Sequence, residues 1–186
     1  MDEFNYLAVL ISIILGLGMT QLLSGFGRWI EQRSTFRAYG PAIAWAAILL
    51  VTHIQTWWSM FSMRDHAGWT FLQFGVVLLQ PITLFLLSAL VLPGANAPEL
   101  DLRSNYFAQR RWFFGLLMTL LVVSILKDLA MNGELPSPAN LGFHGLLFAT
   151  SLIAIATERE GYHRFLAYSS LAVVVVYISA LFARLE

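Results

Sequence analysis

The sequence predicts an all-α polytopic membrane protein, a bundle of six transmembrane helices joined by short loops. Composition is the first reason: hydrophobic residues make up 58% of the chain and charged residues only 12%, against about 25% charged residues in soluble globular proteins. The second is six apolar stretches that carry no Asp, Glu, Lys or Arg, most of them near the roughly 20 residues that cross a bilayer. The third is the short connections between them, which are rich in arginine, proline and glycine.

The six helices are expected in one transmembrane domain that covers residues 1–186. They are predicted at 4–30, 38–63, 67–93, 106–131, 139–157 and 162–184. The first follows Met1-Asp2-Glu3 directly, without the basic segment of a cleavable signal, so it is expected to stay in the protein. The fourth charge-free stretch is too short on its own, so its helix is predicted to continue through Lys127 and Asp128.

Turn residues support these boundaries. Gly40-Pro41 is predicted to open the second helix, and Pro93-Gly94 to close the third. Asn132-Gly133 and Pro136-Ser137-Pro138 flank the turn after the fourth helix. Pro81 lies inside the third helix, where a membrane protein tolerates it as a kink.

Arginine is distributed unequally over the two ends of the predicted bundle. One side holds Arg28, Arg33, Arg37, Arg103, Arg110, Arg111, Arg159 and Arg164; the other holds Arg64, Lys127 and Arg184. Positively charged loops stay in the cytoplasm. The sequence therefore predicts a multi-pass protein of the plasma membrane, with both termini outside, of the kind found in bacterial inner membranes, and with membrane lipids as partners at the arginine-rich face.

Five polar residues in the predicted helices need an explanation, because polar groups inside lipid are costly and often functional. They are His53, Gln55, Gln80, Asp128 and His144. By helical rise, the two histidines lie about 4 Å and about 7 Å outward of their helix centres. We expect these residues to form a polar cavity in the outer half of the bundle, with Gln80 beside a helix break at Pro81. A plain structural kink is the alternative for Gln80-Pro81.

Two histidines at one depth also permit a second interpretation. His53 and His144 are the minimum for axial ligation of a b-type haem. Structural or gating roles explain them as well, so no cofactor is predicted and haem b remains an alternative. No metal site is predicted either. Lys127, about 13 Å from the helix centre, is expected to extend its amine to the lipid headgroups.

Small residues recur on the first helix. Gly16, Thr20 and Ser24 follow one another at four-residue spacing and predict a helix-packing face. Packing against a helix of the same chain is the simplest interpretation. A seam with a second copy or another membrane protein, or the lining of a narrow passage, are the alternatives.

Sequence motifs exclude several functions. The chain has no cysteine and a formal net charge of zero, so thiol chemistry is excluded and no charge pattern indicates nucleic acid. Motifs of hydrolases and phosphate-binding enzymes are absent, which argues against an enzyme. Three classes of function remain: a small carrier, channel or lipid- or small-molecule-binding bundle, a haem electron-transfer protein, and an accessory or structural membrane subunit.

Overall fold

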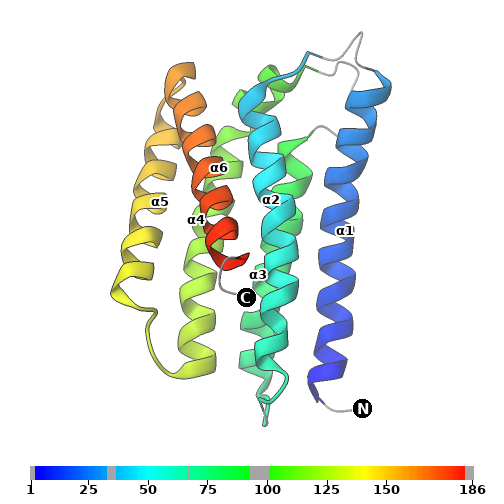
Figure 1. The fold of residues 1–186 in the computed structure, drawn as a ribbon, viewed down its shortest axis with the longest axis vertical. Coiled ribbons are helices and arrows are strands. Elements are labelled where there is room, and N and C mark those ends of the chain that lie inside the picture. Colours follow the sequence, from blue (N-terminus) through cyan, green and yellow to red (C-terminus); the bar gives the residue numbers. More distant parts are fainter. Residues whose placement is uncertain (1–2, 33–36, 67, 93–100, 183–186) are drawn as a thin grey trace.

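The protein is described from a computed structural model that covers residues 3–32, 37–66, 68–92 and 101–182. Within these residues the chain forms six α-helices and one short 3₁₀-helix (Figure 1). The α-helices are α1 (Glu3–Glu31), α2 (Gly40–Ser59), α3 (Phe71–Val91), α4 (Leu102–Asn132), α5 (Pro138–Ala156) and α6 (Glu160–Phe182), and η1 (Met60–Met63) follows α2 directly. The prediction of an all-helical protein is confirmed.

Four of the described helices are long and apolar enough to cross a membrane. They lie at Phe4–Glu31, Phe71–Val91, Leu102–Asn132 and Pro138–Ala156. Only 17% to 39% of the most apolar part of each is buried inside the fold, so most of their apolar side chains point outward. A soluble protein rarely exposes apolar surface on this scale, whereas a helix bundle in lipid does.

Three predicted helix boundaries are wrong by four residues. α3 begins at Phe71 instead of 67, because Thr70 caps it. α4 begins at Leu102 instead of 106, because the Asp101 side chain caps it by accepting hydrogen bonds from the backbone N–H groups of Arg103 and Ser104. α2 ends at Ser59 instead of 63, and the chain continues as the tighter turn of η1. The predicted break at Pro81 is also corrected, since α3 runs through it without interruption. The predicted helix stop at Pro93-Gly94 lies outside the described residues.

Strong capping fixes the ends of α3 and α4 beside each other. Thr70 and Gln73 form a reciprocal capping box at the start of α3. The Gln73 amide also donates to the carbonyl oxygen of Ala130 on α4, at 3.1 Å. Gly133 then ends α4 in the left-handed conformation, with φ of 71°, which glycine adopts without strain.

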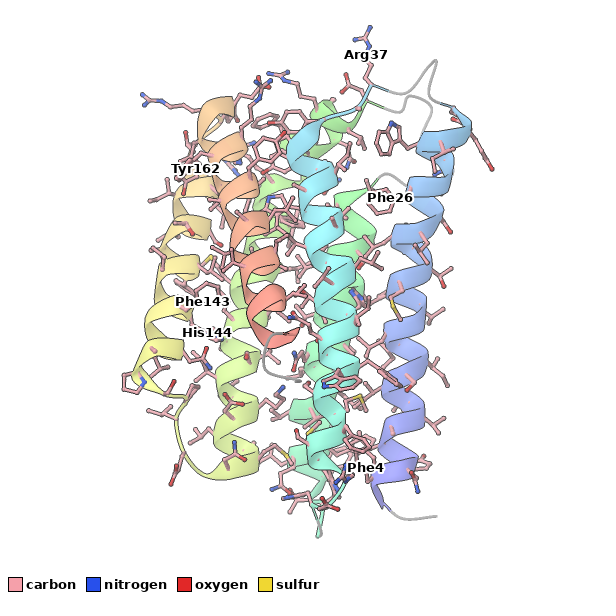
Figure 2. The ribbon with its side chains drawn as sticks, in the orientation of Figure 1. Phe4, Phe26, Arg37, Phe143, His144 and Tyr162 are labelled. Carbon is pink, nitrogen blue, oxygen red and sulfur yellow. The ribbon has the colours of Figure 1, made fainter. Side chains whose placement is uncertain are left out.

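The helices alternate in direction, so two ends of the bundle can be named. The arginine-rich end, at the top of Figure 1, is where α2, α4 and α6 begin, and Figure 2 labels Arg37 there. Arg103 and Arg110 lie early in α4, and Arg164 early in α6. Arg64 and Gly133 lie at the opposite end. α3 packs mainly on α1 and α4, α5 on α4, and α6 on α2, while the consecutive helices α5 and α6 touch little.

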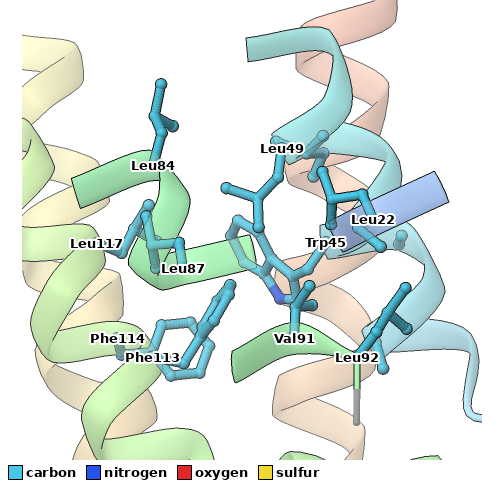
Figure 3. Packing of buried hydrophobic residues seen from close by; sticks show 14 of the residues in the cluster. Leu22, Trp45, Leu49, Leu84, Leu87, Val91, Leu92, Phe113, Phe114 and Leu117 are labelled. Atoms are coloured by element: carbon cyan, nitrogen blue, oxygen red, sulfur yellow. The ribbon is translucent and has the colours of Figure 1, made fainter. Parts of the chain in front are cut away.

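The densest packing lies in the half of the bundle near the arginine-rich end. Trp45 on α2 meets the rings of Phe113 and Phe114 on α4 edge-on, at centroid distances of 5.4 and 5.8 Å. Figure 3 shows leucines of α1, α2 and α3 closing around this aromatic group. Edge-to-face rings in a close-packed core favour fixed helix separations, so these contacts join α2 to α4 in this half of the molecule.

Candidate functional site

A chain of three polar side chains crosses the interior of the other half of the bundle. The Lys127 amine on α4 donates a hydrogen bond to Gln80 Oε1 on α3, at 2.9 Å. Gln80 Nε2 in turn donates to Thr56 Oγ1 on α2, at 3.4 Å. Because an ammonium group only donates, the Gln80 oxygen must face Lys127 and its amide nitrogen must face Thr56. We call Thr56, Gln80 and Lys127 the Lys127 cluster.

Helix geometry explains why this lysine turns inward. α4 continues to Asn132, so the Cα of Lys127 lies about 7 Å before the helix end by helical rise. Long side chains on a helix lean toward its N-terminus, and for α4 that direction leads away from the opposite end. The bond to Gln80 then shows that the side chain lies on the face toward α3. The prediction that Lys127 extends to the headgroups is therefore wrong.

The Lys127 charge has no bonded counter-charge in the described part of the chain. The ion pairs formed there join arginines to Asp65, Glu158 and Glu160. Asp128 is half-buried, but as the next residue it lies about 100° around α4. Two of the three N–H groups of Lys127 find no acceptor among the described residues. A cation held among helices in this way is costly unless an anion or water joins it.

A small cavity adjoins the cluster. Its volume is about 10 Å³, which is room for about one water molecule. All three members of the cluster line it, and the rest of its wall is mainly apolar and comes from α1, α2, η1 and α3. These other lining residues are Ile11, Ser59, Met60, Met63, Val77 and Pro81.

His53 lies one turn of α2 from Thr56, toward the arginine-rich end. Its side chain is 0% exposed, and Nδ1 lies 2.7 Å from the carbonyl oxygen of Leu49. That carbonyl can only accept, so Nδ1 carries the proton and Nε2 presents a lone pair. Nε2 has no partner among the described residues and points at Gly18 of α1.

The structure does not bring the other predicted site residues to this cavity. Gln55 is half-buried and lies about 200° around α2 from His53. His144 lies on α5, where its Nδ1 bonds the Asn140 carbonyl oxygen of its own helix at 2.9 Å. Among the five predicted residues, only Gln80 lines the cavity.

The two histidines that a haem would require lie on different sides of the fold. His53 faces α1, whereas His144 is on α5, and Figures 1 and 2 show these helices at opposite edges of the bundle. Axial ligation needs both imidazoles on one iron, and this arrangement does not provide it. In the described ranges, no group of three or more His, Asp and Glu side chains is placed to hold a metal ion.

The small residues of α1 divide between two faces. Gly18 and Gly25 are buried, and a side chain on either would overlap His53 or Leu92. Gly16 instead has open space where a Cβ would stand, and Thr20 and Ser24 are exposed. The predicted face of Gly16, Thr20 and Ser24 therefore points away from this chain, and packing within the chain uses the other face.

His163 is a buried residue that the sequence analysis missed. It is 0% exposed, Nε2 lies 3.0 Å from the Thr157 carbonyl oxygen, and Nδ1 lies 3.0 Å from the Tyr106 hydroxyl. The carbonyl requires the proton on Nε2, so Nδ1 accepts from Tyr106. Aromatic rings enclose it: Tyr106, Phe107, Phe114 and Tyr162. The predicted sixth helix, 162–184, contains His163, but no role was assigned to it.

Ion pairs beside His163 bind α4 to the start of α6. Glu160 pairs with Arg103 of α4 at 3.3 Å and with Arg164 of its own helix at 2.7 Å. Arg110 of α4 pairs with Glu158, just before α6. Tyr39, which precedes α2, packs edge-on against Tyr106. Burial, together with the nearby Glu160 carboxylate, raises the pKa of Tyr39 to about 12, so its phenol stays neutral. Both ring nitrogens of His163 are hydrogen-bonded, so we assign this cluster a structural role, the packing of α4 against α6.

Comparison with known proteins gives no relative from which a function can be transferred: no family model matches the chain, and no curated protein or solved structure matches it significantly.

Proposed function

We propose that the chain is an integral membrane protein of six spans that carries or conducts a small hydrophilic solute past the Lys127 cluster. α2 and α6 complete the six: α2 contains no charged residue, and after Arg164 the described part of α6 contains none. The arginine-rich end then faces the cytoplasm of a bacterial inner membrane, with both termini outside.

The observation that carries this proposal is the inward Lys127 amine. A lysine this close to a helix end reaches the headgroups at little cost, yet this one bonds Gln80 inside the bundle. Three helices contribute to one hydrogen-bonded chain beside a water-sized cavity. Charged groups that face the interior of a membrane bundle usually mark a solute or ion path.

Lys127→Met tests this function in proteoliposomes. The wild-type chain should raise the permeability to at least one small solute, from a panel that includes urea, glycerol, acetate and chloride, by about tenfold over protein-free vesicles. Lys127→Met should return it to the vesicle baseline, because it removes the charge of the Lys127 cluster. Gly16→Leu is the matched control on the outward face, where the fold has room for a side chain. Equal permeability with and without the wild-type protein contradicts the proposal.

The outward face of α1 supports a second candidate, an accessory membrane subunit. Gly16, Thr20 and Ser24 leave a shallow surface on which another helix can approach closely. This candidate replaces the first if the wild-type protein fails the permeability test and Gly16→Leu releases it from a larger membrane assembly.

A further inference from the structure

We infer that the cavity beside Lys127 binds a single halide ion, chloride being the common one. This inference rests on the proposed function and specifies the solute class of the same site. It follows from the kind of hydrogen-bonding groups that line the cavity, from their charge and from the size of the space.

The polar lining is rich in donors. Lys127 has two N–H groups without an acceptor, the second N–H of Gln80 has none, and no acceptor is found for the Thr56 hydroxyl hydrogen among the described residues. The Gln80 oxygen is already engaged by Lys127. Ser59 also lines the cavity, and its hydroxyl already donates to the Thr56 carbonyl oxygen at 2.9 Å. A bound cation would be repelled by the ammonium charge, whereas an anion would accept from several donors at once.

The positive charge of Lys127 also favours an anion in the cavity. Lys127 forms no ion pair among the described residues, and most of the remaining cavity wall is apolar. An unpaired ammonium in such surroundings lacks the solvation that water gives it. An anion in the cavity neutralises it without a carboxylate from the protein.

Size restricts the anion. The cavity has room for about one water, so phosphate, sulfate and organic carboxylates are too large, whereas a monatomic anion is only slightly larger than water. Met60 and Met63, which have flexible thioether side chains, form part of the wall and can yield by the small amount required.

Thermal unfolding of the detergent-solubilised full chain tests the inference. Sodium chloride and sodium gluconate are compared at equal ionic strength, because gluconate cannot enter a cavity of this size. Chloride at about ten times its Kd should raise the unfolding midpoint of the wild type by about 3 °C, and bromide should act in the same way.

Variants separate this site from a general salt effect. Lys127→Met should lose the chloride response. Gln80→Glu should lose it as well while the protein stays folded, because the new carboxylate supplies Lys127 with an internal partner. Thr52→Val, which removes a hydroxyl bonded only to Ile48 of its own helix, should respond like the wild type.

Two results overturn the inference: an unfolding midpoint that is the same in chloride and gluconate, or a chloride response that persists in Lys127→Met and Gln80→Glu. Failure of the proposed function is distinguishable, since it is seen in vesicle permeability. Chloride stabilisation without transport would support the halide site and contradict the proposed function. Transport of another solute without chloride stabilisation would support the proposed function and contradict the halide site.

Discussion

Replacing His163 by alanine should lower the free energy of unfolding by about 3 kcal/mol. The imidazole is 0% exposed and is enclosed by four aromatic rings, so its removal leaves a cavity between α4 and α6. It also leaves the Tyr106 hydroxyl and the Thr157 carbonyl without their partner. Unfolding of the protein in mixed micelles measures the loss.

Two conservative variants show which bond matters. His163→Asn keeps an acceptor near Nδ1 for Tyr106, and His163→Gln keeps a donor near Nε2 for Thr157, so each should lose less than alanine. His144→Ala is the matched control, since His144 is half-buried and bonds only its own helix. A His163→Ala protein as stable as His144→Ala would contradict the structural role assigned to the His163 cluster.

Gly18→Ala should destabilise the protein by about 1 to 3 kcal/mol, whereas Gly16→Ala should be neutral or slightly stabilising. A Cβ on Gly18 would overlap the His53 ring. That ring cannot easily move, because it is fully buried and Nδ1 is bonded to Leu49. At Gly16, the same methyl group enters open space.

This pair is well controlled, because the same substitution is made twice on one helix, two residues apart. Unfolding in mixed micelles again gives the two free energies. Equal effects at Gly16 and Gly18 would mean that His53 does not pack against α1. The packing of α1 against α2 at Gly18 and His53, as described above, would then be incorrect.

Much of the fold follows from the sequence because a lipid solvent leaves few alternatives. Charge-free stretches gave six helices, and turn residues such as Gly133 placed several of their ends correctly. The start of α4 was misplaced because the cap at Asp101 lies within a polar stretch that has no hydrophobic periodicity. Local capping can therefore extend a helix beyond its apolar part.

The candidate site followed from the sequence only in part. Gln80 was found because a polar residue before Pro81 stands out in an apolar helix. Lys127 was assigned to the headgroups on depth alone, although the N-terminal lean of helical side chains points it inward. The orientation of His53 and His144 depends on how α2 and α5 pack, which depth along a helix does not determine.

Six membrane crossings, with the arginine-rich end inside, are the central claim, and cysteine accessibility tests the four crossings of α2, α3, α4 and α5 most directly. The chain has no cysteine, so single cysteines can be placed at Gln32, Ser104 and Arg159 on one end, and at Asp65 and Glu134 on the other, all of them exposed. An impermeant maleimide added to intact bacterial spheroplasts should label only Asp65→Cys and Glu134→Cys, and the other three should react after lysis. Labelling of Gln32→Cys, Ser104→Cys or Arg159→Cys before lysis would contradict the account.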